Sequence, residues 1–214
     1  MLVYFLLALL LLPFSQAYAV DQQQDNKQII AVHIYTDAQL LELIRDNQYL
    51  QQVTADRCQL VNDIRANAEV LTEPLYQFLW GEMLNHGVCV KANPARGMKQ
   101  LMQSAEQGSP EALVKLAQYY RDGKYVIKDK SRAVHYALPA AAGGDLPAQL
   151  ILVELLGQGF GSPLDYELAY HWLYNQVFAD SATKKKAHKL LQVLATKMPD
   201  SAVARAQKVY LRSY

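Results

Sequence analysis

The sequence predicts an all-α solenoid of stacked helix pairs that ends in a C-terminal helical cap. Residues of similar size recur every 36 positions along the middle of the chain, as at Gly87, Gly123 and Gly159. Within each period, helix-starting and helix-ending residues flank two segments of helical apolar periodicity. Fixed self-similarity of this kind is typical of repeat proteins, in which each unit buries its apolar face against its neighbours.

The composition is that of a folded chain of ordinary charge. Its 214 residues are 51% hydrophobic and 19% charged, with a formal net charge of +1. The apolar fraction excludes a disordered chain, and the near-zero net charge argues against a protein that coats nucleic acid. Two cysteines are too few for a four-thiolate metal site or for a small scaffold held together by disulfides.

Residues 1–19 have the layout of a secretory signal peptide. An apolar run over residues 2–12 is followed by a break at Pro13 and by residues 17–19 (AYA), which fit an A-x-A cleavage site. An uncleaved membrane anchor is the alternative, although about eleven apolar residues are fewer than the roughly 20 that span a bilayer. We therefore expect an exported mature chain, even though no Lys or Arg precedes the run.

Residues 20–35 are expected to be a flexible segment that ends in a short β-prone run. Residues 29–35 (IIAVHIY) are rich in β-branched residues and have no evident strand to pair with. One function for such a run is to add a strand to the edge of a partner's sheet.

Residues 36–71 are predicted to form a degenerate helix pair that precedes the repeats. Thr36 and Gln39 have the spacing of a capping box, which would start the first helix. Thr54 is a candidate cap for the second helix, over residues 56–70.

Residues 72–180 are predicted to hold three units, at about 72–108, 109–144 and 145–180. In the middle unit, Ser109 and Pro110 start the first helix, and the second begins near Asp129. Small residues at repeated positions are expected to let neighbouring helices approach closely. These residues are Gly81, Gly87, Gly97, Ala112, Ala117, Gly123, Ala133, Gly144, Ala148, Gly159 and Ala169.

Residues 181–214 are predicted to be a basic helical cap that closes the solenoid. They carry eight basic side chains and one acidic one, whereas residues 20–90 carry four basic and ten acidic. A solvated surface is the simple interpretation of the basic cap. The functional interpretation is a face that binds an acidic partner, a neighbouring subunit or an anionic surface. The residues of this candidate face are Lys184, Lys185, Lys186 and Lys189.

Cys58 and Cys89 are predicted to form a disulfide. Export would place them in an oxidising compartment. The repeat register places both at the same end of neighbouring units, Cys58 at the start of a second helix and Cys89 in a loop between helices. The bond would add roughly 3–4 kcal/mol by constraining the unfolded chain. Two buried free thiols and a catalytic cysteine are the alternatives.

The motifs give little support to an enzyme. His135 and His171 lie one period apart and so share a face of neighbouring units, but no third metal ligand is evident. The sequence has no P-loop, no G-x-S-x-G and no H-E-x-x-H. We therefore expect no catalytic residue, metal, cofactor or small-molecule substrate, and no nucleic-acid partner.

The repeats resemble the Sel1-like family of helix-pair repeats. Residues 159–169 (GFGSPLDYELA) are similar to its G-x-G-x-x-x-D-x-x-x-A pattern, and residues 140–144 (AAAGG) to its A-A-x-x-G ending. The resemblance covers residues 72–180 and implies a right-handed α/α solenoid.

A closer resemblance is to an exported family of the sodium-driven polar flagellar motor. It rests on residues 55–61 (ADRCQLV), 76–81 (YQFLWG), 87–90 (GVCV) and 166–174 (YELAYHWLY). This resemblance implies a non-enzymatic subunit of the ring around the flagellar basal body. Such a subunit acts with a MotY-type ring protein to recruit and anchor the stator, through the periplasmic part of a PomB-type B subunit.

Two other functions stay open. One is a generic exported Sel1-like adaptor for another envelope complex. The other is a β-lactam-binding or hydrolysing enzyme of the Sel1-like type, although such proteins carry a pair of cysteines in each repeat and this chain has two in all.

Overall fold

The computed structural model describes residues 35–208, which form eleven α-helices and one short 3-10 helix and contain no strand. The expected signal peptide (residues 1–19), residues 20–34 and residues 209–214 lie outside the described residues, and so does all of the expected β-prone run except Tyr35. None of the helices described is long and apolar enough to cross a membrane. The elements are α1 (Asp37–Arg45), α2 (Tyr49–Ala55), α3 (Val61–Glu69), α4 (Pro74–His86), α5 (Pro94–Glu106), α6 (Pro110–Asp122), α7 (Lys130–Ala142), α8 (Leu146–Gly157), η1 (Pro163–Asp165), α9 (Tyr166–Tyr174), α10 (Ser181–Ala195) and α11 (Asp200–Ala206).

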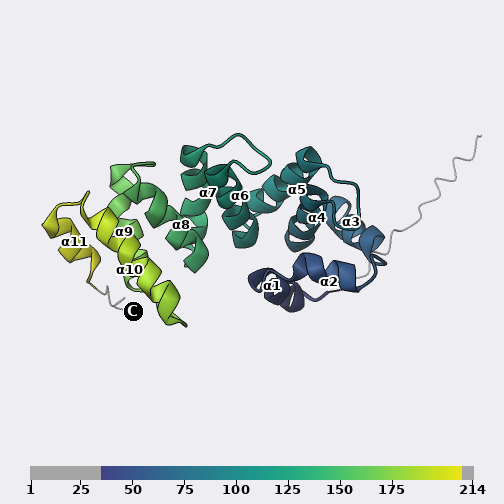
Figure 1. Cartoon of the computed structure of the whole chain (residues 1–214), viewed down its shortest axis with the longest axis horizontal. Coiled ribbons are helices and arrows are strands. Elements are labelled where there is room, and N and C mark those ends of the chain that lie inside the picture. Colours follow the sequence, from purple (N-terminus) through teal and green to yellow (C-terminus); the bar gives the residue numbers. More distant parts are fainter. Residues whose placement is uncertain (1–34, 209–214) are drawn as a thin grey trace, which may run out of the picture. The chain divides into compact units, whose positions relative to one another are not determined.

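The middle of the chain is a series of three helix pairs, α4–α5, α6–α7 and α8–α9. Each helix packs on the one before it and the one after it, so the pairs follow one another in chain order (Figure 1). The two helices of the middle pair begin where the sequence predicts. Ser109 and Asp129 accept hydrogen bonds from the first turns of α6 and α7, and Asp145 does the same for α8. The predicted all-α solenoid of stacked helix pairs is confirmed.

Small residues stand where helices of a pair come closest. A Cβ atom added to Gly97 would lie 2.6 Å from the carbonyl oxygen of Gly81, and one added to Gly81 would lie 2.9 Å from that of Gly97. The backbones of α4 and α5 therefore meet with no room for a side chain between them. Five of the small residues named above are alanines with 1% exposure or less; they are Ala112, Ala117, Ala133, Ala148 and Ala169.

The other glycines named above lie in turns. Gly87 and Gly123 end α4 and α6 with φ of 70° and 77°, a left-handed conformation that favours glycine over other residues. Gly144 and Gly159, both with φ of 91°, follow α7 and α8.

Helix α10 occupies the place of the first helix of a further pair, but α10 and α11 are not among the helices that pack closely on one another. Helix α10 packs on both α8 and α9, as α6 packs on α4 and α5, and α11 packs on α9. Asp180 caps α10 by accepting from the amide of Thr183, in the way Asp145 caps α8. The expected helical cap thus continues the stack, although the 36-residue sequence pattern stops before it.

The N-terminal part differs from the predicted helix pair because it holds three helices. The capping box of Thr36 and Gln39 is present at the start of α1. The role expected for Thr54 is wrong, since Thr54 lies inside α2 and its hydroxyl donates to the carbonyl of Leu50. The helix predicted over residues 56–70 is α3, and it starts only at Val61. The reason is that Arg57 and Cys58 have positive φ angles, which interrupt the helical backbone after α2.

Corresponding turns of the pairs share an unusual backbone conformation. Cys89, Tyr125 and Gly161 lie in the turns within the three pairs, and all have positive φ. Cys58 has positive φ in the turn between α2 and α3, so it does not start a second helix as expected. The structure joins Cys58 and Cys89 in a disulfide with Cα atoms 5.4 Å apart. The bond therefore links two corresponding turns of the stack.

We predict that replacing either cysteine by serine lowers the thermal unfolding temperature. The bond joins residues 31 positions apart, and a loop of that size is worth roughly 3–4 kcal/mol, or on the order of 10 °C for a chain of this length. Differential scanning calorimetry of Cys58→Ser, Cys89→Ser and the double variant measures it. All three should lose the same amount, and an unchanged unfolding temperature in the single variants would contradict the prediction.

Candidate protein-interaction site

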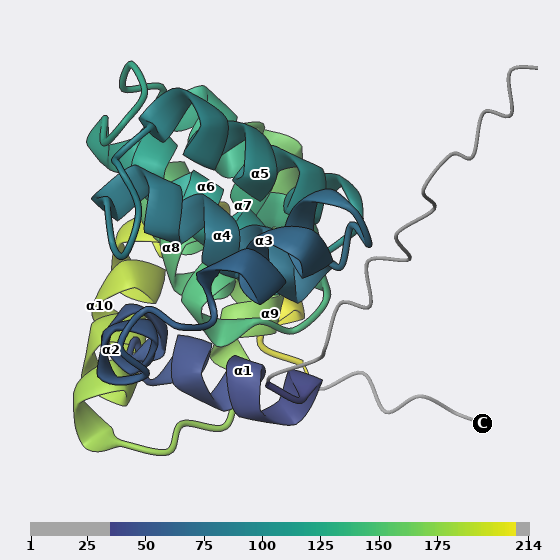
Figure 2. The same ribbon diagram turned by 90° about the vertical axis from the view of Figure 1, so that its right-hand side faces the viewer.

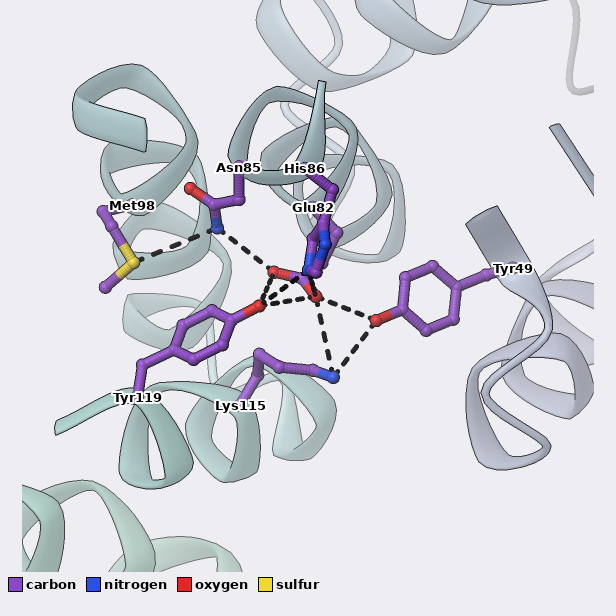
Figure 3. A network of polar contacts seen from close by, with 7 residues as sticks. All are labelled: Tyr49, Glu82, Asn85, His86, Met98, Lys115 and Tyr119. Carbon is purple, nitrogen blue, oxygen red and sulfur yellow. Dashed lines mark hydrogen bonds and ion pairs between the residues drawn. The ribbon is translucent and has the colours of Figure 1, made fainter. Parts of the chain in front are cut away.

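A carboxylate with no solvent exposure lies at the centre of the N-terminal half of the fold. Glu82, in the middle of α4, is fully buried. The hydroxyl of Tyr49 in α2 donates to it at 2.8 Å, and that of Tyr119 in α6 donates at 2.7 Å (Figure 3). The side-chain amide of Asn85 donates at 3.1 Å. A buried carboxylate is tolerated only with partners of this kind.

A lysine and a histidine complete this buried network. The Nζ atom of Lys115 in α6 lies 3.6 Å from Glu82 Oε2 and donates to the Tyr49 hydroxyl oxygen at 3.1 Å. The Nε2 atom of His86 lies 3.7 Å from the same carboxylate oxygen. Side chains of α2, α4 and α6 therefore meet at one acidic group, and α2 is tied to the first two repeat pairs (Figure 3).

Burial sets the protonation of the groups around Glu82. Burial, followed by the nearby carboxylate, raises the pKa of Tyr49 and of Tyr119 well above the usual range. Both tyrosines thus keep their protons and act as donors. Burial also lowers the pKa of His86, with help from Lys124 and Lys115, although the charge of Glu82 opposes the shift. Lys115 is therefore the cation that faces Glu82 at neutral pH.

A groove of about 900 Å³ adjoins this network. One wall is the C-terminal end of α1, at Ile44 and Arg45, and the opposite wall is α6 together with the turn between α7 and α8. Apolar side chains of Leu113, Val114 and Leu146 line that opposite wall. Figures 1 and 2 both show α1 and α2 lying off the row of later helices, which explains how α1 comes to face α6.

The groove combines apolar surface with charges of both signs. Arg45 and Lys115 are its basic residues, and Glu111 and Asp145 are its acidic ones. Burial raises the pKa of Asp145, and the charge of Glu111 adds to the rise, while the bond from the Ala148 amide opposes it. An apolar lining with a few placed polar groups suits a polypeptide segment. Within residues 35–208 no cluster of three His, Cys, Asp or Glu side chains could hold a metal ion.

The candidate cysteines, histidines and lysines lie away from the groove, and of the candidate repeat-packing residues only Gly144 lines it. Pro110, Ala140 and Gly143, named above as parts of helix-start and repeat-end motifs, also line it. The Nδ1 atom of His171 bonds to the carbonyl of Ala206 at 2.8 Å, so this histidine joins α9 to α11. His135 is exposed on α7. Lys184, Lys185, Lys186 and Lys189 are exposed on α10.

Sequence reasoning missed the buried network and the groove. One signal was present, because Glu82 interrupts the otherwise apolar run of residues 79–84 (LWGEML) in a helix that is buried on all sides. The groove had no such signal, since it depends on where α1 lies relative to α6.

Comparisons with known proteins identify the repeats. The family model described as Sel1 repeat matches residues 74–109, 110–145 and 148–174. An uncharacterized protein of Neisseria meningitidis serogroup B is 28% identical over 76% of this chain, which spans 35% of that protein. The crystal structure of a Sel1 repeat protein from Oxalobacter formigenes aligns with 71% of this chain and 52% of its own, at 22% identity and a TM-score of 0.47.

A much stronger similarity is to the sodium-type polar flagellar protein MotX of Vibrio parahaemolyticus. The two sequences are 47% identical over 177 residues, which cover 83% of this chain and 84% of that protein. This alignment extends beyond the three matched repeats. On this identity and coverage, the chain belongs to the MotX family of polar flagellar proteins and is built from Sel1 repeats.

Proposed function

We propose that this protein is a non-enzymatic subunit of the periplasmic ring, the T ring, of the polar flagellar motor. With a MotY-type ring protein, it would recruit and anchor the sodium-driven stator through the periplasmic part of a PomB-type B subunit. The observation that carries the proposal is the 47% identity to MotX over most of both chains. The signal-peptide layout of residues 1–19 supports export to the periplasm.

The groove is the surface that best supports a binding role. It has the size and the mixed lining of a site for a polypeptide segment, and the α1–α2 segment, whose α1 end forms one wall, is fixed at several points. Tyr49 is held by Glu82, Cys58 by the disulfide, and the backbone of Tyr35 by the Tyr76 hydroxyl at 2.9 and 3.1 Å. A pre-formed wall lowers the ordering cost of binding.

Deleting the gene is expected to leave flagella that assemble but do not rotate, because the filament does not need the stator whereas torque does. Electron microscopy of the cells and swimming in soft agar measure the two properties separately. Normal swimming in the deletion strain would contradict the proposed motor function. Loss of the filaments would indicate a role in flagellar assembly instead.

A charge placed in the groove is expected to weaken partner binding while the fold stays intact. Val114 is half-buried on the α6 wall, so Val114→Glu would put a carboxylate against the bound segment. We expect copurification with the ring protein or the stator B subunit to fall about tenfold or more. Val70→Glu is the matched control, since Val70 is 55% exposed and outside the groove. Equal behaviour of the two variants would show that the groove is not the site.

Removing the charge of Glu82 is expected to destabilise the protein. Glu82→Gln would leave Lys115, at 18% side-chain exposure, without its counter-charge, and would weaken the bonds from both tyrosines. Loss of one partner of a buried ion pair costs about 3 kcal/mol. Chemical denaturation measures this cost, with the exposed Glu106→Gln as a control expected within about 0.5 kcal/mol of wild type. A Glu82→Gln protein as stable as the control would contradict the role given to the network.

A further inference from the structure

Helix α10 carries positive charge that nothing in the described structure neutralises. Lys184, Lys185, Lys186 and Lys189 are exposed on it, and no acidic residue lies between Ser181 and Lys197. Within residues 35–208 none of these lysines forms an ion pair.

The nearest acidic residues in the sequence and on α9 already have partners. Asp180 accepts from the amide of Thr183 at the start of α10. Glu167, on α9, is bound by the Arg205 guanidinium at 2.7 and 2.9 Å. These acidic residues therefore do not neutralise the lysines, whose positive electrostatic potential can attract another molecule.

A hollow with a mixed polar and apolar lining lies beside Lys184, at the edge of this basic face. It has a volume of about 300 Å³ and is lined by Leu173, Tyr174 and Phe178 from α9 and the segment after it, and by Leu191 of α10. Lys184 and His188 stand at its edge, one helical turn apart. Tyr174 is 40% exposed, and Val177, in the same segment, is 90% exposed. A partner could thus bury one apolar side chain here while its charged groups meet lysines.

Elsewhere in the stack, first helices of successive pairs are joined by acid–base contacts. Glu82 of α4 faces Lys115 of α6, and Arg121 of α6 faces Glu154 of α8 at 3.6 Å. Helix α10 is the last such first helix among residues 35–208, and it packs mainly on the earlier helices α8 and α9. The lysines of α10 have no acidic partner of the kind that joins α4 to α6 and α6 to α8.

We propose that the α9–α10 surface binds an acidic segment of a partner protein. An apolar side chain of that segment enters the hollow, and its carboxylates lie along Lys184, Lys185 and Lys189. This inference rests on the interaction role proposed above and gives the chemistry of one partner. A lipid surface fits less well, because Ala187, Leu191 and Leu194 of α10 are buried in the core. Val193, at 51% exposure, is the one large apolar residue of α10 that is more than half exposed, so the helix offers no apolar stripe to a bilayer.

The test is binding of a fluorescein-labelled synthetic peptide in which glutamates flank a central phenylalanine, followed by anisotropy with the purified protein. We expect binding at low ionic strength that weakens steeply as salt rises to about 0.5 M. A peptide with alanine in place of phenylalanine should bind more weakly, and so should Tyr174→Ala protein. The double variant Lys184→Glu/Lys189→Glu should lose about tenfold in affinity.

The control is Lys99→Glu/Lys128→Glu, which makes the same charge change at two exposed lysines of α5 and of the α6–α7 turn. It should retain wild-type affinity within about twofold. An equal loss of peptide affinity in both double variants would overturn the proposal. So would equal affinity for the peptides with phenylalanine and with alanine. Binding to phosphatidylglycerol vesicles but not to the peptide, with the same dependence on Lys184 and Lys189, would assign the surface to a membrane. The peptide-binding assay uses purified protein and does not depend on the flagellar motor. Normal swimming of a deletion strain would therefore refute the proposed function but would not decide whether the α9–α10 surface binds an acidic segment.

Discussion

The position of the N-terminal helices depends on the burial of one carboxylate. Glu82 has no exposure, and a carboxylate without partners in that place would carry a desolvation cost of several kcal/mol. Its partners come from α2 on one side and from α6 on the other, so both helices must lie where Tyr49, Lys115 and Tyr119 can reach it. The requirement is geometric as well as energetic. Hydroxyl and ammonium groups must arrive within hydrogen-bond or ion-pair distance of the same two oxygen atoms.

The disulfide adds a second fixed point to the same two helices. Cys58 follows α2 and Cys89 follows α4, so the C-terminal ends of these helices are joined covalently, while the first residue of α2, Tyr49, is joined to the middle of α4 through Glu82. Two separate attachments restrict rotation as well as translation of α2. Because α1 is connected to α2 by a short turn, the same constraints determine where the α1 wall of the groove stands. The groove is thus a consequence of polar and covalent contacts beneath it and beside it, not of its own lining.

The sequence predicted features that depend on nearby residues and failed where distant ones decide. The 36-residue period, the cap at Ser109 and the capping box at Thr36 are local signals, and the structure has each of them. Thr54 was predicted to cap a helix because threonine is a common N-cap residue. Positive φ angles at Arg57 and Cys58 instead delay the start of α3 to Val61. The Glu82 network could not be predicted from the sequence, because Tyr49 of α2 lies 33 residues before Glu82. Helix α10 continues the stack through packing alone, after its sequence has lost the small-residue pattern.

The two ends of the stack are closed by different means, and this difference bears on function. The N-terminal end is held by a disulfide and a buried ion pair, both of which resist local opening. The C-terminal end is held by the packing of Ala187, Leu191 and Leu194 and by the exposed Arg205–Glu167 pair, a kind of contact that contributes little in water. Repeat proteins need a polar surface on their last helix, and lysines meet that need. Solubility accounts for the lysines but not for the partly apolar hollow beside Lys184, whereas the acidic segment proposed above would account for both.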